Sequence, residues 1–109
     1  MDERSASLAA NEAVFRAGNE RIDAMLGDRQ GKTAYMCECG DPTCFQQVDL
    51  TNEEYEEVRS HPARFFVARG HEDLTAGEVV VEEASRFTIV EKRGAEGEIV
   101  ERSDPRAAS

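Results

Sequence analysis

The first quarter of the chain has the apolar period of an amphipathic helix. Leu8, Phe15 and Ile22 recur every seven residues, which places them on one face of a helix. The other apolar side chains on this face are Val14, Ala17, Met25 and Leu26, and the polar side chains opposite are Asn11, Glu12, Arg16, Glu20 and Arg21. The pattern predicts a helix over residues 8–26 whose apolar face packs on the sheet of its own domain.

Two glycines refine this prediction. Gly18 lies in the middle of the predicted helix, where glycine costs about 1 kcal/mol relative to alanine unless another segment packs closely against it. Gly27 followed by Asp28 is a typical helix stop. The polar residues 28–32 then predict a connection to the next element.

The rest of the chain alternates between short strand-like segments and turns. Residues 33–37, 45–50, 64–68, 79–81 and 87–92 have the apolar or alternating patterns of strands. Residues 94–97 contain two glycines and predict a turn, after which residues 98–101 complete a hairpin. We therefore expect a mostly antiparallel sheet of four or five strands.

A second, shorter helix is predicted from a capping motif at its N-terminus. Thr51 and Glu54 have the spacing of a capping box, in which the threonine hydroxyl accepts from the third helical amide and the glutamate reaches back to the cap. About two helical turns follow, with Tyr55 and Val58 facing inward, and they end before Pro62. The chain is thus predicted to be α+β, with the N-terminal amphipathic helix and one short helix packed on the small sheet.

One domain accounts for nearly all of these elements. We assign it to residues 8–101, with flexible ends at residues 1–7 and 102–109. Leu, Ile, Val and Phe make up only about 19% of the chain, near the limit below which charged chains tend to be disordered. A core this thin predicts that something besides apolar burial helps to hold the fold together.

Charge and hydropathy exclude several functions. The chain has 23 acidic and 13 basic side chains and a formal net charge of −10, so nucleic-acid binding is disfavoured. No apolar run is long enough to span a bilayer, and the N-terminus lacks the basic and apolar regions of a signal peptide. We therefore expect a cytoplasmic protein, in which three cysteines are metal ligands or redox groups rather than disulfide partners.

The cysteines are clustered in one polar segment. Cys37, Cys39 and Cys44 lie within eight residues, and Gly40 and Pro42 favour a turn that brings the third back to the first two. In an extended segment residues two apart face the same side, so Cys37 and Cys39 can present both sulfurs to one point. Zn²⁺ prefers four ligands in a tetrahedron, and thiolates with an imidazole are a common structural set.

The fourth ligand is less sharply defined by the sequence. His71 follows Gly70 in a loop after a predicted buried strand and is the favoured candidate. His61, Asp41 and a thiol from another molecule remain alternatives. The predicted metal ligands are therefore Cys37, Cys39, Cys44 and His71, and a zinc ion held by them would add its binding energy directly to folding.

Two classes of function compete for this site. The first is a zinc-stabilised module with a closed Cys3His site that acts in regulation by binding another protein. The second is a thiol-based redox sensor that releases zinc on oxidation, although the neighbouring Glu38 and Asp41 are expected to raise thiol pKa values and so disfavour reactive thiolates. Catalysis is less favoured. It requires an open position on the metal and a base such as Glu38 or Glu72, or a cysteine nucleophile paired with a histidine.

The ordered motifs of this chain resemble those of a small bacterial protein family, chiefly of actinobacterial type, with no established activity. The shared pattern is CxCG-x3-C, EYE-x-VR, P-x-RF-x-V, GHE and VVEK, which correspond here to residues 37–44, 54–59, 62–67, 70–72 and 89–92. The resemblance covers roughly residues 12–106. It implies that these segments assemble as one domain; it implies no reaction and does not identify a metal.

Overall fold

The structure is a computed structural model that describes residues 3–26, 31–75 and 77–106. Within these residues the chain forms three helices and five strands. Their order is α1 (Glu3–Leu26), β1 (Lys32–Met36), β2 (Gln47–Thr51), α2 (Asn52–Arg59), β3 (Arg64–Val67), β4 (Glu78–Glu83), β5 (Thr88–Lys92) and α3 (Gly94–Arg102).

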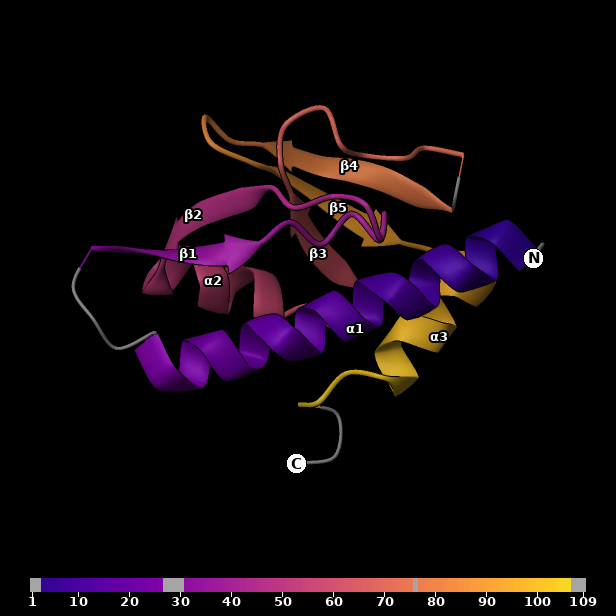
Figure 1. The fold of residues 1–109 in the computed structure, drawn as a ribbon. Helices are drawn as coiled ribbons and strands as arrows, with labels where there is room; N and C mark the ends of the chain where they lie inside the picture. Colours follow the sequence, from indigo (N-terminus) through magenta and orange to yellow (C-terminus); the bar gives the residue numbers. More distant parts are fainter. Residues whose placement is uncertain (1–2, 27–30, 76, 107–109) are drawn as a thin grey trace.

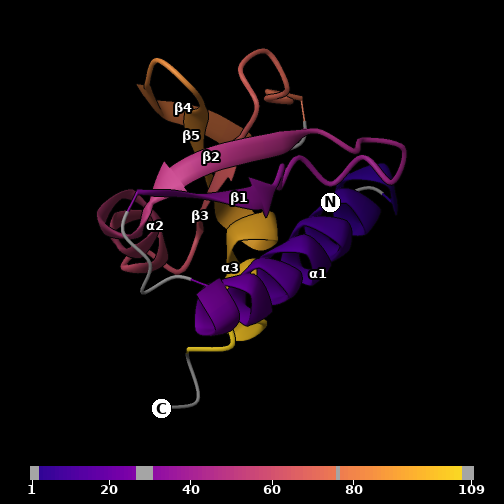
Figure 2. The same cartoon turned by 60° about the vertical axis from the view of Figure 1, so that its left-hand side comes forward.

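The predicted α+β class is confirmed, but the strands form two antiparallel sheets instead of one. β1 pairs with β2, and the other three strands are arranged in the order β3-β5-β4. β2 runs directly into α2, so the chain leaves the first sheet before β3 forms the edge of the second. Figures 1 and 2 show α1 running beneath β1 with α3 packed beside it.

Three aromatic side chains join the two sheets and α2. Tyr35 of β1 stacks on Tyr55 of α2 with ring centroids 4.5 Å apart. Phe66 of β3 meets both rings edge-on, at 5.9 and 6.0 Å, an arrangement that aromatic pairs favour. All three are at most 1% exposed, so this cluster is the centre of the core.

The face of α1 that contacts the rest of the protein is largely polar, and the predicted orientation of this helix was wrong. Its buried residues are Ser5, Ala9, Glu12, Arg16 and Asn19. By contrast, Val14 and Met25 are 66% and 79% exposed. Leu8, Phe15 and Ile22 are only partly buried.

Glu12 and Arg16 are buried beside polar groups from distant parts of the chain. Arg16 donates hydrogen bonds to the carbonyl oxygens of Pro62 and Val100. The Glu12 carboxylate lies 2.9 Å from the Lys92 ammonium. A buried charge without a partner is very costly, and these partners lie too far along the chain for a local period to reveal them.

The ends and middle of α1 also differ in part from the prediction. The helix begins at Glu3 instead of Leu8, so residues 3–7, expected to be flexible, are helical. Gly18 is closely packed, because an added Cβ would lie 2.5 Å from the Cε of Met36. The predicted stop at residues 27–28 lies outside the described residues.

The predicted hairpin at the end of the chain is wrong, since residues 94–102 form α3. The Gly97 amide donates to the Arg93 carbonyl at 3.3 Å, and a Cβ on Gly97 would lie 2.7 Å from the Lys92 carbonyl oxygen. Glycine thus lets the helix turn tightly against the end of β5. A four-residue apolar and acidic segment such as 98–101 fits either a strand or a helix, because it is too short to define a period.

Smaller differences affect the second strand and the tail. β2 begins at Gln47, and Phe45, predicted to lie in this strand, is 89% exposed. The capping box between Thr51 and Glu54 is confirmed, and so is the inward orientation of Tyr55 and Val58. In the tail, Asp104 is buried and Arg106 pairs with Glu20 and Glu56 at 2.6 and 2.7 Å, so residues 103–106 are held against the domain.

Candidate metal centre

The first two cysteines lie on an extended segment that continues β1. The Cys37 amide donates to the Gln46 carbonyl at 3.1 Å, and the Glu38 amide donates to the Phe66 carbonyl at 3.0 Å. Alternation along this segment places Cys37 and Cys39 on one side and Glu38 on the other. The segment thus faces the second sheet with one side and the candidate metal centre with the other.

A tight turn returns the third cysteine to the first two. Gly40 has a φ of +81°, and a Cβ there would lie 2.8 Å from Leu8 and 2.9 Å from Glu12. The Cys44 amide donates to the Asp41 carbonyl at 3.0 Å. Only glycine therefore suits both the backbone angle and the close approach of α1 at this position.

His71 reaches the same point from the segment after β3. Its amide donates to the Ala68 carbonyl at 3.0 Å, and Gly70 has a φ of +86°, so the chain turns sharply as it leaves the strand. Pairing of β3 with β5 fixes where this turn begins. The structure therefore brings the histidine favoured by the sequence to the cysteines.

The four predicted side chains form one compact cluster. The ligand atoms of Cys37, Cys39, Cys44 and His71 all lie within 4.8 Å of one another. The Nδ1 atom of His71 is 3.6 Å from the Sγ of Cys37 and 3.5 Å from the Sγ of Cys44. A tetrahedral zinc site with Zn–S of ~2.3 Å and Zn–N of ~2.05 Å separates sulfur from nitrogen by about 3.6 Å. The residues present therefore fit a single tetrahedral metal ion.

Backbone amides point at the sulfurs, as a thiolate cluster requires. The Ala68 amide lies 3.1 Å from the Cys37 Sγ. The amides of Asp41 and Gln46 likewise donate hydrogen bonds to the sulfurs of Cys39 and Cys44. Hydrogen bonds to the charged form of a group stabilise that form, so the fold is prepared to hold negative charge on sulfur.

Crowding of the sulfurs separates their pKa values. A hydrogen bond from the Cys37 thiol lowers the pKa of Cys39 to about 5. The same interaction, followed by burial, raises the pKa of Cys37, and burial raises that of Cys44. The main causes are thus the sulfurs and burial, and not the carboxylates of Glu38 and Asp41 that the sequence indicated. Ionisation of all three thiols requires a cation at the centre of the cluster.

Glu38 has a structural role that the sequence did not reveal. Its carboxylate is fully buried and lies 2.9 Å from the Arg59 guanidinium, which is 2% exposed. It also accepts hydrogen bonds from the Asn19 side chain at 2.8 Å and the Phe66 amide at 3.2 Å. Glu38 therefore anchors the cysteine segment to α1, α2 and β3, and it faces away from the sulfurs, so it is not placed to act as a base there.

The alternative fourth ligands lie outside the cluster. His61 follows α2, with its Nε2 3.8 Å from the Glu57 carboxylate and its side chain 43% exposed. The Asp41 carboxylate accepts hydrogen bonds from the amide and hydroxyl of Thr43 at 2.9 and 2.8 Å. In the described part of the chain, three or more groups able to ligate a metal converge only at Cys37, Cys39, Cys44 and His71.

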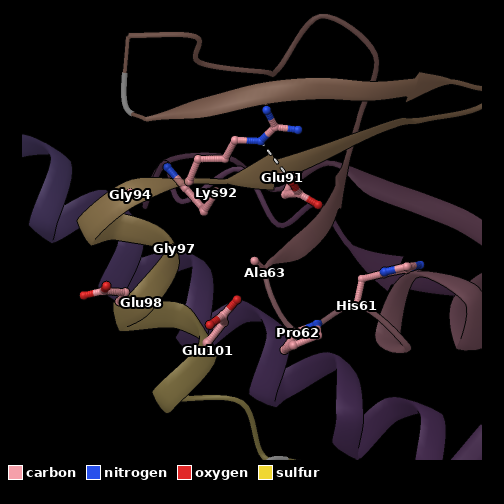
Figure 3. Close-up of a pocket in the computed structure, with 10 residues that line it drawn as sticks. His61, Pro62, Ala63, Glu91, Lys92, Gly94, Gly97, Glu98 and Glu101 are labelled. Carbon is pink, nitrogen blue, oxygen red and sulfur yellow. Dashed lines mark hydrogen bonds and ion pairs between the residues drawn. The ribbon is translucent and has the colours of Figure 1, made fainter.

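Two clefts lie near candidate residues. One of about 500 Å³ borders the cluster and is lined in part by Cys39, His71 and Glu72. Figure 3 shows the other, of about 400 Å³, with Glu98 and Glu101 of α3 on one side and His61 on the opposite side. Its charged groups are dispersed, so this second cleft has no catalytic or metal-binding constellation.

No family model, curated protein or solved structure matches this chain. The resemblance to a bacterial family therefore stays a prediction. No helix in the described residues has both the length and the apolar character needed to cross a bilayer. The candidate function accordingly depends on the geometry of the cysteine and histidine cluster.

Proposed function

We propose that Cys37, Cys39, Cys44 and His71 bind one Zn²⁺ ion as a structural site. The observation that carries this proposal is the spacing of the ligand atoms, with Sγ to Nδ1 distances of 3.6 and 3.5 Å. These distances equal the separation in a tetrahedral zinc site within about 0.1 Å. Three sulfurs and one nitrogen also favour zinc over magnesium or calcium, which prefer oxygen ligands.

The zinc ion would stabilise the fold by joining its two sheets. Cys37, Cys39 and Cys44 lie between β1 and β2, whereas His71 follows β3 of the other sheet. A bond between these segments replaces some of the apolar burial that the chain lacks. Binding energy of a structural metal is available only to the folded state and so adds to its stability.

A structural role is better supported than a catalytic one. Four protein ligands close a tetrahedral sphere and leave no position for water. Glu38, one candidate base, is paired with Arg59 on the far side of the segment. We therefore infer that the protein acts through its surface. Its proposed role is to bind another protein in regulation, in the cytoplasm.

Oxidative release of zinc is a second candidate function, which the exposure of Cys44 favours. Cys37 and Cys39 are buried, but Cys44 is only partly so, and the three sulfurs lie within 4.8 Å of one another. Hydrogen peroxide would take two electrons from two thiolates, forming one S–S bond and, with two protons, two molecules of water. The zinc ion would then lose two of its four ligands and dissociate.

The zinc proposal is tested by native mass spectrometry with elemental analysis of protein purified under reducing conditions. We expect one zinc per chain in the wild type, and loss of zinc with a lower melting temperature in Cys44→Ser and His71→Ala. His61→Ala is the matched control and should retain zinc. Folded wild-type protein without zinc would overturn the proposal.

The redox candidate needs a separate measurement. Zinc-loaded protein is treated with a stoichiometric amount of peroxide, and released zinc is followed with a chromophoric chelator. Release of one zinc per chain, reversed by a thiol reductant, supports a sensor. Retention of zinc under conditions that oxidise free thiols would leave only the structural role.

A further inference from the structure

Outside the metal centre, one groove combines an apolar floor with an acidic rim. It lies between α2 and the end of the β4–β5 hairpin and has a volume of about 240 Å³. The floor consists of Ala84, Phe87 and Ile89, and the rim includes Glu53, Glu57 and Glu82. The groove is smaller than typical small-molecule pockets, which begin at about 300 Å³, and its size suits one long side chain.

The rim carries negative charge that is largely unpaired among the residues that the structure describes. Glu53 and Glu82 are exposed, and neither forms an ion pair with another described residue. Glu57 is 72% exposed, and its carboxylate lies 3.8 Å from the His61 Nε2. With a net charge of −10, the protein attracts cations to such a site and repels nucleic acids and anionic membranes.

An arginine of this chain already shows how a cation binds at the edge of the groove. The Arg86 guanidinium lies 5.6 Å from the centre of the Phe87 ring and 2.6 Å from the Glu54 carboxylate. It also donates a hydrogen bond to the Asp49 carbonyl. Arginine stems pack on apolar surface while the charged end meets carboxylates, so the local chemistry suits a second basic side chain.

We propose that this groove is a docking site for a basic segment of a partner protein. An arginine or lysine of that segment lays its stem on Phe87 and Ile89 and directs its charge to Glu53 and Glu82. This inference rests on the proposed function as a protein-binding module and specifies the chemistry of the partner. It involves none of the four metal ligands, so the groove and the metal centre are tested separately.

The test is a nuclear magnetic resonance titration of the zinc-loaded, ¹⁵N-labelled full chain. The probe is a capped hexapeptide with leucine and arginine at its centre and alanine elsewhere. The control peptide replaces arginine with citrulline, which keeps the shape and removes the charge. We expect saturable shifts of amide signals in α2 and at Phe87 and Ile89, and weaker binding of the citrulline peptide.

Charge-matched variants separate the groove from the general acidity of the protein. Glu53→Gln combined with Glu82→Gln should weaken binding about fivefold or more, since each exposed pair contributes a few-fold. Glu98→Gln combined with Glu101→Gln removes the same charge from α3 and should change affinity less than about twofold.

Several results would overturn the inference. These are equal binding of the two peptides, equal effects of the two double variants, and shifts centred away from the groove. The same shifts with Ca²⁺ or spermine at equal concentration would also overturn it, because they would show a general cation site. Metal analysis of the same sample distinguishes a failed groove from a failed zinc proposal.

Discussion

The Glu12 carboxylate lies 2.9 Å from the Lys92 ammonium, and both side chains are fully buried. Glu78 approaches the same ammonium at 3.6 Å, so two carboxylates share one cation. Burial raises the pKa of Glu12 to about 9, against the opposing effect of Lys92, and burial also raises the pKa of Glu78. The Glu12 and Glu78 carboxyl groups therefore retain a proton between them at neutral pH.

This retained proton makes stability depend on pH. Because the folded pKa of Glu12 is about 9 and its ordinary value is 4.5, its contribution to stability falls as pH rises through this range. Glu12→Gln cannot ionise, so it should lose less stability on raising the pH. We expect the difference in unfolding free energy between the variant and the wild type to change by about 2–3 kcal/mol in favour of the variant between pH 6 and 8.

Urea unfolding at saturating zinc measures this difference, since pH effects on the metal ligands are common to both proteins. Glu98→Gln, a change of the same type on an exposed residue of α3, is the control. Identical pH dependence in the wild type and Glu12→Gln would show that Glu12 is ionised in the folded protein.

Removal of the Glu38 carboxylate should be strongly destabilising. Glu38→Ala leaves the 2%-exposed Arg59 guanidinium without its ion-pair partner, and breaking a buried pair in this way costs about 3–5 kcal/mol. The double variant Glu38→Met, Arg59→Met removes both charges and should cost less than Glu38→Ala. Urea unfolding of the zinc-loaded proteins checks the order, and a double variant less stable than Glu38→Ala would contradict it.

Glu38→Ala should also lower the affinity for zinc. Glu38 holds the backbone between Cys37 and Cys39 through hydrogen bonds to Asn19 and Phe66. Residues that orient metal ligands typically contribute about 10–100-fold to affinity. We expect a loss of about tenfold in a chelator competition, whereas Glu53→Ala on the surface of α2 should leave the affinity unchanged.

Gly40→Ala and Gly31→Ala separate backbone strain from crowding. Both glycines have positive φ, +81° and +91°, but a Cβ on Gly40 would meet Leu8 and Glu12 whereas Gly31 has nothing within 4 Å. Gly31→Ala should cost about 1 kcal/mol. Gly40→Ala should cost about 1–3 kcal/mol more and weaken zinc binding. Equal losses of melting temperature in the two variants would show that α1 does not press on the turn.

Phe45 and Phe66 should respond in opposite ways to truncation. Phe45 is 89% exposed and Phe66 is fully buried. Phe45→Ala should change the free energy of unfolding by less than about 0.5 kcal/mol, and zinc stoichiometry should stay the same. Phe66→Ala should cost about 3–5 kcal/mol. A large loss for Phe45→Ala would mean that this ring is buried, as its place in the sequence pattern indicated.

The features predicted well are those fixed by neighbours in the sequence. The capping box of Thr51 and Glu54 and the convergence of Cys37 and Cys39 each follow from a spacing of two or three residues. The α+β class can also be predicted from the sequence, because assigning it requires only knowing which segments are helices and which are strands. The separation into two sheets does not follow from the sequence in this way, since it depends on which distant strand pairs with β3.

The features missed are those decided by distant partners. Glu12 and Arg16 look like solvent-facing residues until Lys92, Pro62 and Val100 are placed beside them. Glu38 likewise looks like an acidic neighbour of the thiols until Arg59 is known to pair with it. An acidic composition with few large apolar residues was a signal that some charges would be buried in pairs, but composition does not identify the pairs.

Alternate side chains of the extended segment from Cys37 to Cys39 face the core and the metal centre. Glu38 faces the core, and the two cysteines face the metal centre. Each side chain faces mainly one of the two, and the shared backbone passes the effect of a substitution such as Glu38→Ala from one to the other. Insertion or deletion of one residue is different, because it would exchange the two faces and direct Glu38 at the sulfurs and a thiol at Arg59. We therefore expect chain length in this segment to be constrained more tightly than residue identity, and insertions to be tolerated best in the exposed turn at residues 41–43.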